Sequence, residues 1–82
     1  MTAKKVIVYS TQMCPWCVKA KEWLKENKIK FEDVDLSKSE NRERAIKLIE
    51  KTGNSGVPQI DVDGEIIVGF DVDKLKELLG IE

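Results

Sequence analysis

The sequence contains no histidine, only two cysteines, and no large excess of either charge. A zinc site needs four ligands, so a site within one chain would have to use carboxylates, and a site between two chains would need a dimer. The 14 basic and 15 acidic residues leave a net charge of -1. No strong field is available to attract nucleic acid or an anionic membrane, and we expect neither partner.

Long apolar runs are also absent, since no stretch approaches the roughly 20 residues that span a bilayer. Lys4 and Lys5 are followed by an apolar stretch, residues 6–9, that is shorter than the core of an export signal. We therefore expect a cytoplasmic protein. In that reducing compartment a close cysteine pair is more often catalytic or metal-binding than structural. The length of 82 residues predicts a single domain, 1–82, which we expect to be a monomer.

Apolar periodicity and turn residues predict the element order β-α-β-α-β-β-α. The strands are expected at 5–9, 29–36, 58–63 and 65–68, and the helices begin at Pro15, after the capping-box residues Ser37–Glu40, and after Asp71. Gly53 is expected to end the second helix, and Asp63-Gly64 predicts a hairpin turn. Candidate core residues are Val6, Val8, Ile46, Leu48, Ile60 and Leu75.

The two strand–helix units predict parallel first strands, and the final hairpin is antiparallel. Because the strands show few charges toward either side, helices are expected on both faces of the sheet. The predicted fold class is α/β, with a four-stranded mixed sheet.

The sequence Cys14-Pro15-Trp16-Cys17 lies where the first strand's loop enters a helix. A cysteine at a helix N-terminus lies beside unpaired backbone N–H groups, which favour the nucleophilic thiolate. Cys17, three residues later, lies on the same side of the helix and can attack a mixed disulfide held at Cys14. Pro15 stiffens the turn, and Trp16 is expected at the surface as an aromatic contact. A redox pair is favoured over half of a zinc site.

Val57-Pro58 precedes the third strand, and its spacing alone indicates an ordinary turn. Together, however, the element order, Cys14-Pro15-Trp16-Cys17, Gly56-Val57-Pro58-Gln59 and Val68-Gly69-Phe70-Asp71 resemble glutaredoxins over essentially the whole chain. Short prokaryotic glutaredoxin-like proteins and the redoxins that serve ribonucleotide reductase are similar here.

The resemblance implies a thioredoxin fold, with Pro58 cis and facing the Cys14 sulfur, and a Val57 backbone that pairs with an extended thiol substrate. It implies a dithiol–disulfide oxidoreductase that reduces protein disulfides, with ribonucleotide reductase as a possible substrate. The redox-active disulfide Cys14–Cys17 would be its only redox group. The implied substrate-binding residues are Thr11, Pro15, Trp16, Val57, Pro58, Gly69, Phe70 and Asp71.

Two departures from glutathione-using glutaredoxins bear on the electron donor. Thr11 stands where they commonly carry a lysine, and Gly69-Phe70 stands where they carry a glycine pair. The redoxins reduced by thioredoxin reductase carry Gly-Phe at this point. The expected donor is therefore a thioredoxin-reductase-type flavoprotein, with glutathione as the second candidate. Thioredoxins often have a buried acid behind the cysteines, and the first strand offers none.

Two alternatives belong to other classes. In an iron–sulfur cluster carrier, Cys14 from two chains would hold one cluster, but family members of this kind usually have a single active cysteine. A visible spectrum after anaerobic purification discriminates it from the oxidoreductase. A purely structural domain gives no reason for a cysteine pair at a helix start.

Overall fold

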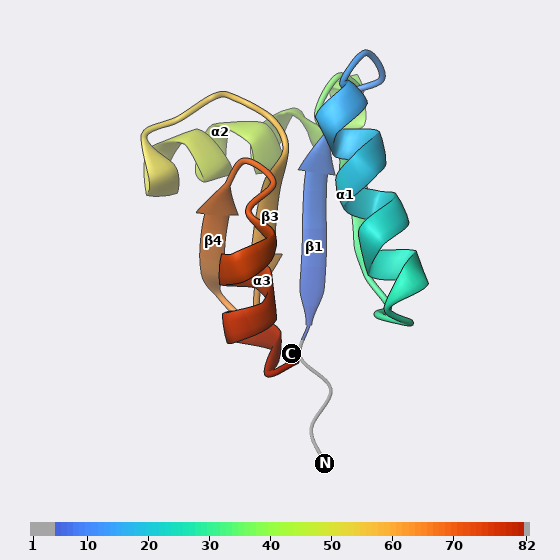
Figure 1. The fold of residues 1–82 in the computed structure, drawn as a ribbon. Coiled ribbons are helices and arrows are strands. Elements are labelled where there is room, and N and C mark those ends of the chain that lie inside the picture. The colour runs from blue at the N-terminus through green and yellow to red at the C-terminus, as the bar shows by residue number, and fades with distance from the viewer. Residues whose placement is uncertain (1–4, 82) are drawn as a thin grey trace.

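The computed structural model describes residues 5–81, so residues 1–4, on which part of the localisation argument rests, lie outside the described part. The chain alternates strands and helices in the expected order (Figure 1). The elements are β1 (Val6–Ser10), α1 (Pro15–Glu26), β2 (Glu32–Asp35), the 3-10 turn η1 (Ser39–Asn41), α2 (Arg42–Thr52), β3 (Gln59–Val62), β4 (Glu65–Val68) and α3 (Val72–Leu79).

The four strands form one mixed sheet in the order β2-β1-β3-β4. β1 and β2 are parallel, as expected, whereas β3 is antiparallel to β1. The expectation that the second strand–helix unit also leads into a parallel strand is wrong. Eleven residues make α2 about 16 Å long, and this helix runs across the strands rather than back along them (Figure 1). The chain therefore enters β3 at the end of the sheet where it left β2.

Both faces of the sheet carry helices, which confirms that expectation. One face packs against α1 and α3, and the other against α2. The buried residues of the first face are Val6, Val8, Ala20, Leu24, Ile60, Val62, Ile67 and Leu75. Those of the second are Ile7, Tyr9, Val34 and Leu48. β1 contributes to both clusters because successive side chains point to opposite faces.

The candidate core is confirmed at every position except Ile46. The buried positions are Val6, Val8, Leu48, Ile60 and Leu75. Ile46 is 47% exposed, because it lies two residues from Leu48 and therefore about 200° around the helix from the buried side chain. α2 buries Leu48 alone, so its apolar face is narrower than its sequence suggests.

Local signals at the ends of elements have a mixed outcome. The Asp71 side chain accepts a hydrogen bond from the Lys74 N–H and caps α3, as expected. The capping box at Ser37 and Glu40 is wrong, because the Ser37 hydroxyl is bound to Asp35 and η1 begins at Ser39 without a side-chain cap. The second strand is also shorter than expected, since it comprises Glu32–Asp35 only.

The hairpin turn between β3 and β4 has the expected residues and geometry. Asp63 and Gly64 have φ values of 55° and 100°, the left-handed region that this turn requires. Within residues 5–81, none of the helices is long and apolar enough to cross a bilayer.

Candidate redox site

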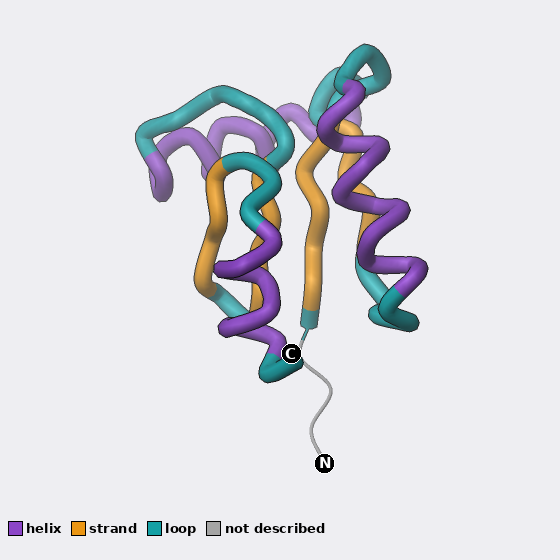
Figure 2. The backbone as a smooth tube through the Cα atoms, in the orientation of Figure 1, coloured by secondary structure: helices purple, strands orange, loops and turns teal. Residues whose placement is uncertain are grey.

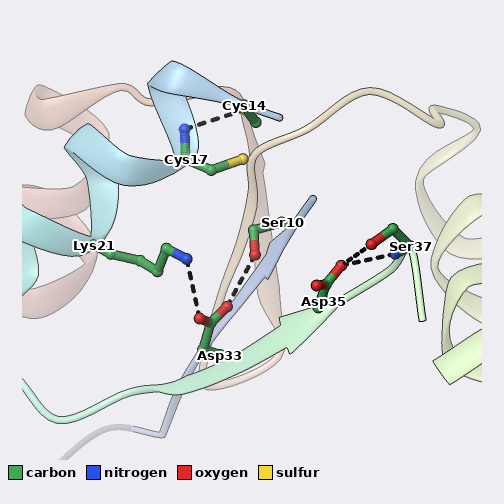
Figure 3. Close-up of polar contacts among 7 residues, drawn as sticks. All are labelled: Ser10, Cys14, Cys17, Lys21, Asp33, Asp35 and Ser37. Atoms are coloured by element: carbon green, nitrogen blue, oxygen red, sulfur yellow. Dashed lines mark hydrogen bonds and ion pairs between the residues drawn. The ribbon is translucent and has the colours of Figure 1, made fainter. Parts of the chain in front are cut away.

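Cys14 is the N-cap residue of α1. Its backbone is extended, with φ -123° and ψ 101°, and the helix begins at Pro15, which has no N–H to leave unpaired. The Cys14 Sγ accepts a hydrogen bond from the backbone N–H of Cys17 at 3.2 Å (Figure 3). A donor N–H and the positive end of the helix both stabilise a negative sulfur. This partly exposed position is therefore suited to a nucleophilic thiolate.

Cys17 has a contrasting environment, because its side chain is fully buried, at 0% exposed. Burial, and to a smaller extent the contact with Cys14, raise the pKa of Cys17 to about 11. A backbone hydrogen bond from Thr11 and the charge of Lys21 act in the opposite direction. At neutral pH Cys17 is consequently a protonated thiol held one turn below the exposed end of the helix.

The surface around Cys14 is apolar. Met13 is 93% exposed and Trp16 is 58% exposed, which confirms the expected surface position of Trp16. The Lys19 ammonium lies 4.7 Å from the centre of the Trp16 ring, within the range of a cation–π contact. These side chains offer a partner an apolar surface beside the reactive sulfur.

The Val57–Pro58 peptide bond is cis, as the resemblance implied. Pro58 directly precedes Gln59, which pairs with Tyr9 on one side and Val68 on the other. The end of β1, the start of β3 and the end of β4 therefore meet at one end of the sheet. The smooth trace shows the loop before α1 at the same end (Figure 2). The Gly69 N–H donates to the Pro58 carbonyl at 2.7 Å, so the two predicted motifs are in direct contact.

Gln59 belongs to a motif quoted above but is not among the predicted site residues. Its side chain is fully buried, and its Nε2 donates to the carbonyls of Asn54 and Gly56 at 2.7 and 2.9 Å. These bonds tie the loop before Val57 to the sheet. The signal in the sequence is a polar residue at an inward-facing strand position, which is rarely buried unless it is hydrogen-bonded.

Phe70 and Asp71 both have structural contacts. The Phe70 ring packs edge-on against Trp23 of α1, with ring centres 6.3 Å apart. The Asp71 carboxylate accepts from the Lys74 N–H. The binding of substrate by these two residues stays a prediction, and so does that by Thr11, whose backbone faces the Cys17 sulfur.

The glutaredoxin family model matches residues 6–67 of the chain. The chain belongs to the glutaredoxin family. It is 45% identical over 73 residues to an uncharacterised glutaredoxin-like 8.6 kDa protein in the rubredoxin operon of Clostridium pasteurianum, covering 85% of this chain and 95% of that protein. It is 37% identical to glutaredoxin 1 of Rickettsia conorii, covering 80% of this chain but only 65% of that longer protein.

The crystal structure of methanoredoxin from Methanosarcina acetivorans superposes with a TM-score of 0.84 at 29% identity, covering 96% of this chain and 87% of the other. The likeness confirms the thioredoxin fold. This glutaredoxin-family protein is accordingly a thiol–disulfide oxidoreductase. Its natural substrate and electron donor are matters for proposal.

A polar cluster below Cys17 is the second feature that the sequence did not reveal. It comprises Ser10 of β1, Lys21 of α1 and Asp33 of β2 (Figure 3). β1 carries no acid, and the acid of this cluster, Asp33 of β2, is 45% exposed rather than buried. The sequence did contain a signal for the position of Asp33. Side chains alternate along β2, so Asp33 must point away from the face of the sheet that buries Val34.

Proposed function

We propose that this glutaredoxin-family protein reduces disulfides in proteins, with Cys14 as the nucleophile and Cys17 as the resolving thiol. The observation that supports it is the asymmetry of the pair. Cys14 is partly exposed and its sulfur accepts an N–H, whereas Cys17 is buried with a pKa of about 11. The partly exposed sulfur of Cys14 is accessible to a substrate, and the buried thiol of Cys17 remains protonated until the second step.

The proposed reaction has two steps, which together transfer two electrons to the substrate. The Cys14 thiolate attacks one sulfur of the substrate disulfide, forming a mixed disulfide and releasing the other substrate sulfur as a thiolate, which takes a proton from water. Cys17 then loses its proton and attacks the Cys14 sulfur. The Cys14–Cys17 disulfide forms, the second substrate sulfur leaves and is protonated, and two electrons have passed to the substrate.

We infer that extended polypeptide is the preferred substrate. Val57 lies at the entry to β3, where the backbone before the cis Pro58 can pair with an added strand. The exposed side chains of Met13 and Trp16 provide apolar contact area beside it. Ribonucleotide reductase is one candidate protein substrate. The reducing cytoplasm is the compartment in which such an enzyme would act.

The roles of the two cysteines are tested by exchanging each for serine. Cys14→Ser is expected to abolish reduction of insulin, and Cys17→Ser is expected to accumulate a mixed disulfide with a protein substrate, seen as a reducible band on a gel. The wild-type protein at the same concentration is the matched control. Dithiol activity that survives in Cys14→Ser would refute the assignment of the nucleophile.

The proposed electron donor is a thioredoxin-reductase-type flavoprotein rather than glutathione. Thr11 has no ammonium to pair with a glutathione carboxylate, and a charge-assisted hydrogen bond of this kind is worth about 1.5–3 kcal/mol. Turnover of one disulfide substrate is compared with NADPH and the flavoprotein and with glutathione and its reductase. Thr11→Lys should improve the glutathione reaction alone. Efficient glutathione-driven turnover by the wild-type protein would refute this choice. Phe70 is unsuitable for the same test, because its ring packs against Trp23.

A further inference from the structure

Three polar side chains below Cys17 form a connected cluster that the two proposed steps do not yet use. The Ser10 hydroxyl donates to Asp33 Oδ1 at 2.9 Å. The Lys21 ammonium donates to Asp33 Oδ2 at 3.0 Å. Because each carboxylate oxygen has its own donor, Asp33 has a fixed orientation and holds the ammonium in one place.

The three residues of the cluster differ in burial. Ser10 is 2% exposed, while the side chains of Lys21 and Asp33 are 24% and 45% exposed. Isolated surface ion pairs contribute little to stability. This pair differs from an isolated one, because a buried hydroxyl fixes the carboxylate from the inner side. The Lys21 ammonium is therefore held in a more defined position than it would be in an isolated surface pair.

The Cys17 side chain and the cluster lie on the same side of α1, between this helix and the sheet (Figure 3). In Figure 3 the Cys17 side chain points from α1 toward the end of β1, where Ser10 lies, and the Lys21 side chain extends from the same helix to Asp33. The charge of Lys21 lowers the pKa of Cys17, against the larger effect of burial.

The other groups near Cys17 and this cluster set the background for any titration. Cys14 raises the pKa of Cys17, and the backbone of Thr11 lowers it. Glu22 and Lys25, from α1, line the same groove of about 430 Å³ as Lys21 and Asp33. These two opposite charges are exposed and provide matched surface controls.

We propose that Lys21, positioned by Asp33 and Ser10, stabilises the Cys17 thiolate when the mixed disulfide on Cys14 is resolved. The inference rests on the proposed dithiol mechanism. In the mixed disulfide Cys14 carries no negative charge, so its opposing effect on Cys17 is removed and burial is the main obstacle to ionisation. Cys17 gives its proton to water, its thiolate attacks the Cys14 sulfur, and the substrate thiolate leaves. Ser10, Lys21 and Asp33 are positioning residues that do not exchange atoms in this step.

The experiment follows both steps in one reaction. Reduced protein is mixed with excess of the chromogenic disulfide dithiobis(nitrobenzoate) in a stopped-flow instrument. Attack by Cys14 releases one coloured thiolate at a rate that depends on reagent concentration. Attack by Cys17 then releases the second at a rate that does not, and the pH dependence of this second phase gives the apparent pKa of Cys17 in the mixed disulfide.

Lys21→Met is expected to raise this apparent pKa by about 0.5–1, the size of one charge–charge interaction at a partly solvated site. The thiolate fraction at pH 7 then falls about three- to tenfold. A more basic thiolate is also a better nucleophile, so the second phase should slow by only about two- to fourfold. Lys21→Arg keeps the charge and should preserve the wild-type profile. Lys25→Met removes the same charge from the same helix and should do so too.

Asp33→Ala tests whether Asp33 positions Lys21, and the direction in which it shifts the apparent pKa of Cys17 gives the answer. If Asp33 holds the ammonium in place, its loss raises the apparent pKa in the same direction as Lys21→Met. If Asp33 only neutralises Lys21, its loss lowers the apparent pKa, and the proposal is overturned. An unchanged profile in Lys21→Met, or an equal shift in Lys25→Met, also overturns it. The first phase should be the same in all variants, and the absence of a second phase from the wild-type protein would instead refute the dithiol mechanism.

Discussion

The two thiols should differ strongly in their reaction with an alkylating reagent. The reduced, folded protein is treated with iodoacetamide at pH 7, and the mass of the intact chain is followed with time. One adduct is expected to form quickly, at Cys14. The second should form far more slowly, because Cys17 is buried and alkylation requires its thiolate.

The pKa of Cys17 sets the size of this difference. With a pKa of about 11 against an ordinary 9.0, about one Cys17 in 10,000 is ionised at pH 7, compared with about 1% of an ordinary cysteine. Because a more basic thiolate is also a better nucleophile, Cys17 should react about 10- to 15-fold more slowly than an ordinary cysteine, before any loss of access through burial is counted. The Cys14→Ser variant isolates Cys17. Its Cys17 should react faster than this figure, because the contact with Cys14 is lost, but still more slowly than a free thiol.

The same chain unfolded in guanidinium is the control, since both cysteines are then exposed and should be alkylated together. A second adduct that forms in the folded protein as fast as in the unfolded one would refute the reasoning. It would mean that neither burial nor the contact with Cys14 protects the resolving thiol. The Cys17→Ser variant, which can accept a single adduct, identifies the site of the first reaction.

Two further predictions concern stability. Leu75 is fully buried, so Leu75→Ala should lower the free energy of unfolding, measured in urea, by about 2–5 kcal/mol. Ile46→Ala, at a half-exposed site, should change it by less than about 0.5 kcal/mol. Similar losses in both variants would contradict the assigned core. The pKa of Cys17 is about 11 in the folded protein against an ordinary 9.0, so the unfolded chain loses this proton first. The difference in unfolding free energy between the wild-type protein and Cys17→Ala should be constant below pH 9. It should then fall by about 1.4 kcal/mol per pH unit as the pH rises toward 11. A difference that does not change between pH 9 and 11 would contradict the raised pKa.

Features with a local cause could be predicted from the sequence. Pro15 can begin a helix because the first helical position needs no N–H. Asp71 can cap a helix because its short side chain reaches a backbone N–H of the first turn. Asp63-Gly64 tolerates the positive φ values that the hairpin needs. Each of these depends on residues within one turn of the chain. The position of Cys14 at a helix start, and hence the redox chemistry, belongs to the same group.

Features that depend on how elements pack could not be predicted in this way. The direction of β3 follows from α2 lying across the strands, and no residue pattern records that angle. Ile46 has the apolar side chain of a core residue, but only a narrow face of α2 packs against the sheet, and Ile46 lies outside that face. Gln59 and Asp33 have polar side chains whose partners come from other parts of the chain. Their roles become visible only when the strand register is known.

The two sulfurs depend on different parts of the molecule. The Cys14 sulfur accepts a hydrogen bond from the N–H of Cys17, so its hydrogen-bond partner lies within the first turn of α1. The Cys17 sulfur is buried against the sheet, and its pKa depends on burial, on Cys14, on the Thr11 backbone and on Lys21, whose ammonium is bound by a carboxylate of β2. Changes on β2 can therefore alter the resolving step while the attacking thiol keeps its local environment. A dithiol enzyme built in this way can change its rate of release without changing its rate of attack.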